Sequence, residues 1–160
     1  ELSCRMLMLA GIDDKDECGR LVDEAVESGE ALKHFEMMVK LQGGDVSYIE
    51  DTSKFRKASF SREVYAPADG YITHMDSEKI GLTAVLLGAG REKKDDDINH
   101  AAGIIIAAKT GDFVKRGELL ATLFADDESR LDGAELRYLF AVSIGDKKPA
   151  EQPMILDYID

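Results

Sequence analysis

The segment from Gly111 to Leu123, which reads GDFVKRGELLATL, constrains the fold of this chain more than any other. Gly111 and Gly117 can adopt a positive φ at no steric cost. Asp112 can hydrogen-bond to the neighbouring backbone of a turn. The two cations just before Gly117 are expected to face water, and the apolar run over 119–123 is expected to face a core. The segment therefore predicts a tight turn that leads into a buried strand.

Further upstream, residues 66–72 read APADGYI. This segment and the one over 111–123 resemble the first and second halves of a biotinyl or lipoyl carrier domain, which is a small folded-over β-sandwich also called a barrel-sandwich. The resemblance implies a modified lysine on a hairpin soon after the second half. Residues 125–128 occupy that place and read ADDE, without a lysine. The sequence therefore predicts the carrier scaffold and excludes the carrier chemistry.

Composition narrows the class of protein further. The chain has 160 residues, of which 44% are hydrophobic and 32% charged, as in globular proteins. Its net charge of −12 would repel phosphate backbones, which argues against nucleic-acid partners. No apolar run approaches the ~20 residues of a membrane span, and none is typical of a secretory signal. Cys4 and Cys18 fall in helical patterns, so reduced thiols and a cytoplasmic location are expected.

The first part of the chain has a helical pattern. Apolar spacing predicts three helices, over 1–10, from a cap at Asp13 or Asp14 to about 28, and over 30–41. In the third helix the residues expected to face inward are Leu32, Phe35, Met38 and Val39. The first helix has no capping segment before Glu1, so we expect the fold to continue upstream. Residues 45–61 are polar and predict a surface linker. We therefore expect terminal helices of a preceding domain over 1–44, a linker over 45–61 and a second domain over 62–160.

The second domain is expected to be of the α+β class. The patterns predict strands over 62–66, 70–75, 119–125 and 154–159, and a short strand is possible over 141–144. Residues 103–108 form a continuous apolar run, which predicts a strand buried on both faces. Helices are predicted from Asp76 or Ser77 to about 87, and from Asp126 or Asp127 to about 140.

Few side chains are arranged for catalysis or metal binding. His34, His74 and His100 do not show metal-ligand spacing with one another or with either cysteine. Cys18 has acidic neighbours, which would raise the pKa of a thiol and make it a poor nucleophile. The run over 95–97, DDD, follows two lysines and is interpreted as a solvated loop. We therefore expect no metal, no cofactor and no catalytic residue in this chain.

The segment over 87–91, LGAGR, leaves two interpretations open. Gly88 and Gly90 allow close backbone approach, and free N–H groups of such a turn can hold an anion. Phosphate-binding loops usually precede a helix, whereas this segment follows one. In the alternative interpretation Gly88 ends the helix, Gly90 permits tight packing and Arg91 pairs with an acidic neighbour.

Several motifs, in order, are similar to the pyrimidine-nucleoside phosphorylase family. They are the segments over 32–45 (LKHFEMMVKLQGGD), 81–91 (GLTAVLLGAGR), 97–104 (DINHAAGI) and 109–123. The resemblance covers nearly the whole chain. It implies that 1–44 are the last helices of the family's α/β domain and that 62–160 are its C-terminal α+β domain.

The resemblance also implies an activity for the parent protein, which is phosphorolysis of a pyrimidine nucleoside to the free base and a pentose 1-phosphate. The phosphate-binding and base-binding residues of the family lie upstream of Glu1, so no catalytic or substrate-binding residue is assigned here. The C-terminal domain would form one wall of a closing cleft, with Gly88, Gly90 and Arg91 as candidates to face it. We expect a dimeric parent, and an inactive, monomeric chain by itself. The alternatives are a non-catalytic binding or structural module on a carrier-like sandwich, and an AMP-cleaving relative that shares this domain.

Overall fold

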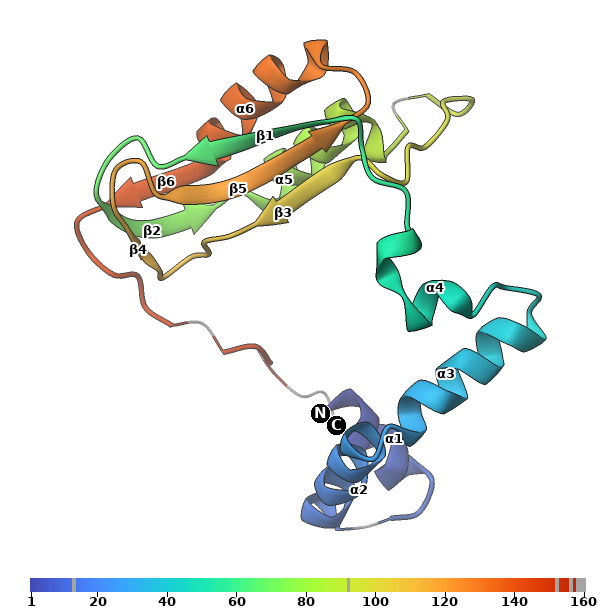
Figure 1. Cartoon of the computed structure of the whole chain (residues 1–160). Coiled ribbons are helices and arrows are strands. Elements are labelled where there is room, and N and C mark those ends of the chain that lie inside the picture. Colours follow the sequence, from blue (N-terminus) through green and yellow to red (C-terminus); the bar gives the residue numbers. More distant parts are fainter. Residues whose placement is uncertain (13, 92, 152, 156, 158–160) are drawn as a thin grey trace. The chain divides into compact units, whose positions relative to one another are not determined.

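The chain divides into two compact units, Glu1–Phe55 and Arg56–Asp160. A computed structural model describes residues 1–12, 14–91, 93–151, 153–155 and 157 (Figure 1). The first unit contains only helices, and the second contains helices and two sheets. The chain is therefore a mixture of helices and antiparallel sheets, as the patterns predicted.

The first unit consists of three helices and two short helical turns. They are α1 (Leu2–Leu9), α2 (Lys15–Glu27), α3 (Glu30–Leu41), α4 (Ser47–Glu50) and the 3₁₀ turn η1 (Thr52–Lys54). Asp14 caps α2, because its carboxylate accepts hydrogen bonds from the N–H groups of Asp16 at 2.9 Å and Glu17 at 3.2 Å. Asp13, the other predicted cap, lies outside the described residues. All three predicted helices are confirmed.

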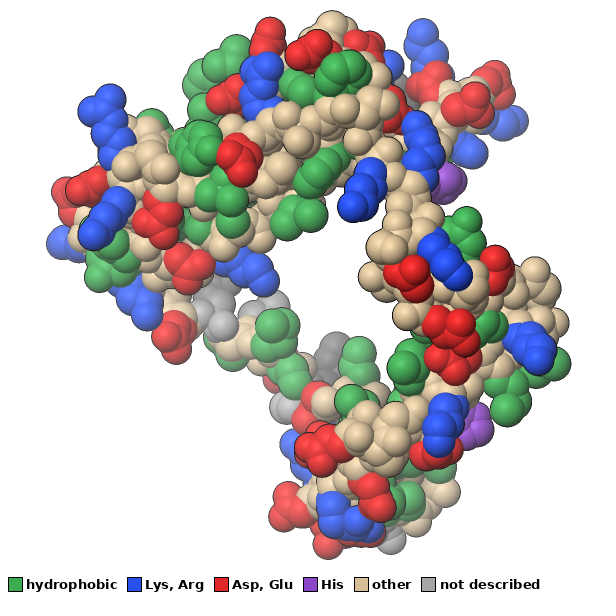
Figure 2. All heavy atoms as spheres, in the orientation of Figure 1, with side chains coloured by type: hydrophobic (Ala, Val, Ile, Leu, Met, Phe, Trp, Pro, Cys, Tyr) green, Lys and Arg blue, Asp and Glu red, His purple; other side chains and the backbone are tan. Residues whose placement is uncertain are grey.

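The apolar stripe of α3 is largely exposed, in contrast to the prediction. Cys4 and Cys18 are buried, as free thiols, among its described residues. Helix α3 has no buried residue, and Leu32 is 53% exposed. The prediction of inward positions in α3 is wrong for Leu32, Phe35 and Met38, whereas Val39 is half-buried. The helices and turns of this unit offer no second layer to cover that stripe. Figure 2 shows hydrophobic side chains at the surface among the acidic and basic ones.

The predicted linker over 45–61 contains local structure. Helix α4 and turn η1 lie within it, and the rings of Tyr48 and Phe55 meet edge to face at 5.1 Å. The compact units separate between Phe55 and Arg56. Strand β1 (Phe60–Tyr65) then begins before the predicted position 62.

The first sheet of the second unit has the strand order β1-β5-β3, with all neighbours antiparallel (Figure 1). Strand β5 (Leu119–Ala125) lies at its centre, and all of its residues are buried or half-buried, as the apolar run predicted. Strand β3 (Gly103–Ile106) lies at an edge. The prediction that this segment is buried on both faces is wrong, because Ile105 is 63% exposed. An edge strand has one partner, and here only one of its faces contacts the core.

The second sheet has the order β4-β2-β6 and is also antiparallel. Strand β2 (Gly70–Met75) lies between β4 (Phe113–Val114) and β6 (Val142–Gly145). Strand β6 is the short strand that the sequence left as a possibility. The predicted last strand is absent at Met154, Ile155 and Asp157, and its other residues lie outside the described part of the chain.

The segments over 66–72 and 111–123, which were predicted as the two halves of a sandwich, lie against each other. The N–H of Ala66 donates to the carbonyl of Glu118 at 2.8 Å, and the N–H of Gly117 donates to the carbonyl of Ala66 at 2.9 Å. A second reciprocal pair joins Ile72 to the turn, since it accepts from the N–H of Gly111 at 2.8 Å and donates to the carbonyl of Asp112 at 2.9 Å.

The predicted turn itself is confirmed. Gly111 and Gly117 have φ values of 97° and 82°, which a residue with a Cβ rarely adopts. The carboxylate of Asp112 accepts a hydrogen bond from the N–H of Lys109 at 2.8 Å. The sequence therefore identified both the turn and the segment against which it packs.

Two helices complete the core of the second unit. They are α5 (Ser77–Ala84), which continues as a π-helical turn, η2 (Val85–Ala89), and α6 (Ser129–Ala141). Helix α6 packs on β1 and β5, and α5 packs on α6. The fully buried side chains of the core come from both sheets and from both helical segments, among them Val64, Ile72, Leu87, Val114, Leu120, Leu123, Leu131 and Tyr138.

The two predicted helices differ from the structure at their ends. Asp76 caps α5, accepting from the N–H of Lys79 at 3.1 Å, but the α-helical part ends at Ala84. Helix α6 begins at Ser129, later than predicted. Asp127 lies before it and accepts from the N–H and hydroxyl of Ser129 at 3.0 Å and 2.6 Å. Asp126 instead bonds to other segments, as described below.

Candidate functional site

The segment Gly88–Arg91 follows an irregular helix end. The π-helical turn η2 widens the helix at Val85–Ala89, a deviation that often occurs at functional sites. Gly88 has a φ of 107° and a ψ of 4°, whereas Gly90 is extended. A Cβ on Gly90 would lie 2.7 Å from Cγ2 of Val85. Both glycines therefore have a structural reason for their identity, as the second interpretation of this segment predicted.

A hollow of about 510 Å³ opens beside this segment. Gly88 and Gly90 line it together with charged side chains of both signs, namely Lys93, Asp96, Asp97 and Arg130. The guanidinium of Arg130 donates to the carbonyl of Leu86 at 3.3 Å and lies 3.4 Å from the carboxylate of Asp127. The backbone of a helix end and charged side chains of both signs therefore line this hollow.

The three candidate residues Gly88, Gly90 and Arg91 do not all lie at the hollow. Gly88 and Gly90 are brought together at the hollow, whereas Arg91 is exposed and is not among the lining residues. Within the described part of the chain Arg91 forms no ion pair. The acidic partner expected in the second interpretation is thus not found among those residues.

Sequence reasoning missed the residues that hold this segment in place. The backbone N–H of Asn99 donates to the carbonyl of Gly88 at 2.9 Å. The side-chain amide of Asn99 donates to Asp126 at 2.8 Å, and its oxygen accepts from Arg56 at 3.0 Å and from the N–H of Ala101 at 3.1 Å. The only sequence signal was that Asn99 falls within the motif over 97–104.

Asp126 is the acceptor at the centre of this network. Its carboxylate accepts from the backbone N–H of Ser59 at 2.8 Å, from the Ser59 hydroxyl at 2.9 Å, from Asn99 and from the Arg56 guanidinium. These donors, with those of Ser59 foremost, lower the pKa of Asp126 to about 2. The group is therefore an ionised acceptor and a poor general base near neutral pH.

The low pKa of Asp126 predicts a pH-dependent effect of Asp126→Asn. A folded-state pKa below the unfolded value of about 3.9 contributes stability that is complete above the unfolded pKa and is lost as the pH falls through about 2. We expect Asp126→Asn to lower the free energy of unfolding near neutral pH. The deficit should shrink as the pH falls from about 6 to about 2. Urea denaturation of both proteins across this range measures it, and a deficit that stays constant would contradict the assignment.

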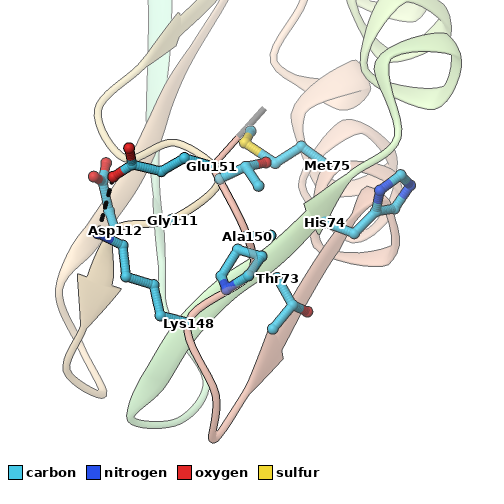
Figure 3. A pocket seen from close by; sticks show the side chains of 10 residues that line it. Thr73, His74, Met75, Gly111, Asp112, Lys148, Ala150 and Glu151 are labelled. Carbon is cyan, nitrogen blue, oxygen red and sulfur yellow. Dashed lines mark ion pairs between the residues drawn. The ribbon is translucent and has the colours of Figure 1, made fainter. Parts of the chain in front are cut away.

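A second, larger hollow of about 670 Å³ lies beside the Gly111 turn (Figure 3). Residues of β2, including Thr73 and His74, line it together with residues that follow β6. Figure 3 shows the Lys148 ammonium next to the carboxylate of Glu151, at 3.5 Å, while His74 points to the other side. Because its one cation is paired and its histidine points away, this hollow does not gather groups for acid–base chemistry.

Among the described residues no group of three or more His, Cys, Asp or Glu side chains could hold a metal ion. No helix among them has the length and apolarity needed to cross a bilayer. Burial and, to a smaller extent, neighbouring acidic groups raise the pKa of the Cys18 thiol.

Comparisons with known proteins relate this chain to a single family. Residues 71–144 match the family described as "Pyrimidine nucleoside phosphorylase C-terminal domain". The chain is 40% identical over 129 residues to a pyrimidine-nucleoside phosphorylase of Bacillus subtilis (strain 168), covering 80% of this chain and 30% of that protein. It is 36% identical over 113 residues to the protein of that name from Geobacillus stearothermophilus, covering 71% of this chain and 26% of that protein.

A third relative extends the same pattern. The pyrimidine-nucleoside phosphorylase of Staphylococcus aureus (strain bovine RF122 / ET3-1) is 38% identical over 126 residues, which cover 78% of this chain and 29% of that protein. The matched part of the chain thus covers less than a third of the length of each of these three relatives. The matched residues include the Gly88 segment, strands β3, β4 and β5, and helix α6. Because the identity also extends over most of the chain, the chain belongs to the pyrimidine-nucleoside phosphorylase family and contains its C-terminal domain.

Proposed function

We propose that this chain is the C-terminal part of a protein that cleaves pyrimidine nucleosides with inorganic phosphate, giving the free base and a pentose 1-phosphate. The observation that carries the proposal is the identity of 36% to 40% with three relatives named pyrimidine-nucleoside phosphorylase. We further propose that the two sheets form a barrel-sandwich of the carrier type, supported by the reciprocal hydrogen bonds between the 66–72 and 111–118 segments.

In this proposal the second unit is one wall of a cleft that closes over the substrates. Closure of such a cleft excludes water and aligns the reacting groups. The Gly88–Arg91 segment faces the cleft, and Arg91 supplies a positive charge towards bound substrate or the opposite wall. The exposure of Arg91 and the hollow lined by Gly88 and Gly90 support this role.

The proposal also covers the rest of the chain. Residues 1–44 are the last helices of a preceding α/β domain, which is consistent with the exposed apolar stripe of α3. The 160-residue chain is monomeric and inactive by itself, and the complete protein is a cytoplasmic dimer. The free thiols of Cys4 and Cys18 fit a reducing compartment.

Activity assays of the complete protein and of the 160-residue chain test the proposal. We expect the complete protein, expressed from its whole reading frame, to release uracil from uridine only when inorganic phosphate is present. The 160-residue chain should release none. Phosphate-independent release, or no release by the complete protein, would overturn the proposed activity and favour a non-catalytic module.

Replacement of Arg91 tests its proposed role in the complete protein. Arg91→Ala should lower kcat/KM for uridine phosphorolysis by at least about tenfold, which corresponds to about 1.4 kcal/mol of transition-state stabilisation. Arg116→Ala is the matched control, because Arg116 is an exposed arginine of the same unit in the Gly111–Gly117 turn. If the two variants have the same kcat and KM, Arg91 has no part in the mechanism.

A further inference from the structure

Three segments that are distant in the sequence meet at one carboxylate. Arg56 and Ser59 precede β1, Asn99 precedes β3, and Asp126 follows β5. Arg56 lies 70 residues from Asp126 in the sequence and Asn99 lies 27 from it, yet both donate to its carboxylate. Through its backbone N–H, Asn99 extends this network to the carbonyl of Gly88. We refer to Arg56, Ser59, Asn99 and Asp126 as the Asp126 network.

We propose that Asn99 and Asp126 are positioning residues, which hold the Gly88–Arg91 segment in the place it needs for phosphorolysis. This inference rests on the proposed function. Neither side chain is assigned to substrate or to the reacting atoms. Their effect is transmitted through the Asn99 backbone to the carbonyl of Gly88.

The chemistry of Asn99 suits this task. Its short side chain carries an acceptor and a donor at the same time, and the structure uses both. The oxygen accepts from Arg56 and from the N–H of Ala101, while the nitrogen donates to Asp126. Because the side chain is held from both sides, the Asn99 backbone is fixed as well. Its N–H can therefore hold the Gly88 carbonyl at one position.

Asp126 is suited to anchor the network. Its two oxygens accept four hydrogen bonds, from Ser59, Asn99 and Arg56, which matches the acceptor capacity of a carboxylate. Asp126 comes directly after Ala125, which is fully buried and is the last residue of the central strand β5. The network thus connects a rigid part of the core to an irregular turn.

The network lies outside the hydrophobic core, which separates its role from that of packing. None of its four residues belongs to the buried cluster, which includes the neighbouring residues Leu87, Ala125 and Leu131. The core contacts around η2 and β5 do not depend on hydrogen bonds of the network. Loss of the network should therefore displace the Gly88–Arg91 segment while the core of the unit stays packed.

An exchange of the two side chains gives a sharp test in the complete protein. Asn99→Asp alone places two carboxylates side by side. Asp126→Asn alone replaces one acceptor oxygen with an NH2 group, so the four donors around that residue can no longer all be accepted. Each single change therefore disrupts the network. The double variant N99D/D126N restores one carboxylate and one amide with donor and acceptor reversed. Arg56 and the N–H of Ala101 can then donate to the carboxylate at position 99, and Ser59 can donate to the amide oxygen at position 126.

We expect each single variant to lower kcat for uridine phosphorolysis at least tenfold, with KM for uridine changed less than twofold. The double variant should recover kcat to within threefold of the unchanged protein. Asp132→Asn is the matched control, because Asp132 pairs with Arg62 at 2.5 Å elsewhere in the same unit and is 80% exposed. It should keep kcat within twofold. Assays are run well below the melting temperature of every variant, so that unfolding does not imitate the loss.

The outcomes separate the two proposals. If the unchanged protein does not phosphorolyse uridine, the proposed function fails and the positioning role fails with it. If the unchanged protein is active but either single variant keeps its kcat, or the double variant recovers none of the loss, only the positioning role is overturned. Recovery of kcat in the double variant, with an unaffected control, supports it.

Discussion

Replacement of Gly70 by alanine is expected to lower the free energy of unfolding by roughly 3 kcal/mol, a large part of the stability of a small domain. Gly70 has a φ of 152°, and an added Cβ would lie 2.9 Å from the carbonyl oxygen of Gly145 and 2.7 Å from Cγ2 of Ile144. The backbone oxygen belongs to β6, which pairs with β2, so relief of the clash requires the strands to separate. Urea denaturation of the 160-residue chain measures the loss.

Gly81→Ala is the control for this prediction. Gly81 lies within α5, and an alanine Cβ there would have no neighbour within 4 Å. Removal of a flexible residue from a helix is expected to raise stability by about 0.5 to 1 kcal/mol. The two glycine-to-alanine changes should thus have opposite signs. A Gly70→Ala protein as stable as Gly81→Ala would show that β2 and β6 are not joined as described.

Leu123→Ala is expected to lower the free energy of unfolding by about 2 to 5 kcal/mol. Leu123 is fully buried on the central strand β5, opposite Arg62 of β1 and Ile104 of β3. Truncation removes apolar contacts and leaves a cavity between strands that hold each other on both sides, so collapse around it is restricted. Thermal and urea denaturation of the 160-residue chain measure the effect.

Leu136→Ala is the same chemical change at a different place. Leu136 lies in α6 and is 60% exposed. Leucine and alanine have similar helix propensities, so a change of less than about 0.5 kcal/mol is expected. Equal losses for the two leucines would contradict the location of the core in the β1-β5-β3 sheet and α6.

The local elements of this protein could be predicted from the sequence, since their signals lie within a few residues of one another. A cap at Asp13 or Asp14 and the helix that follows were predicted, and Asp14 is a cap, because a capping carboxylate and its N–H donors are sequence neighbours. The Gly111–Gly117 turn was predicted from its glycines and confirmed by their positive φ values. The family itself was also identified from motifs in order.

Burial could be predicted less well. Gly103–Ile106 is as apolar as a buried strand, yet Ile105 is exposed, because β3 lies at the edge of its sheet. The apolar positions of α3 have helical spacing, yet Leu32 and Phe35 are exposed in a unit with no further layer. Hydrophobic patterning indicates which face of an element prefers burial, and it does not say whether another element covers that face.

By itself the sequence determined the helices, the turn from Gly111 to Gly117, and the family. Only the tertiary structure decided that Asp126, one of two residues expected to cap a helix, instead accepts hydrogen bonds from Arg56, Ser59 and Asn99. Only the tertiary structure, too, placed Arg91 outside the hollow that Gly88 and Gly90 line. The reason is physical. A cap or a turn depends on dihedral angles of adjacent residues, whereas a bond across 70 residues depends on the path of the whole chain between them.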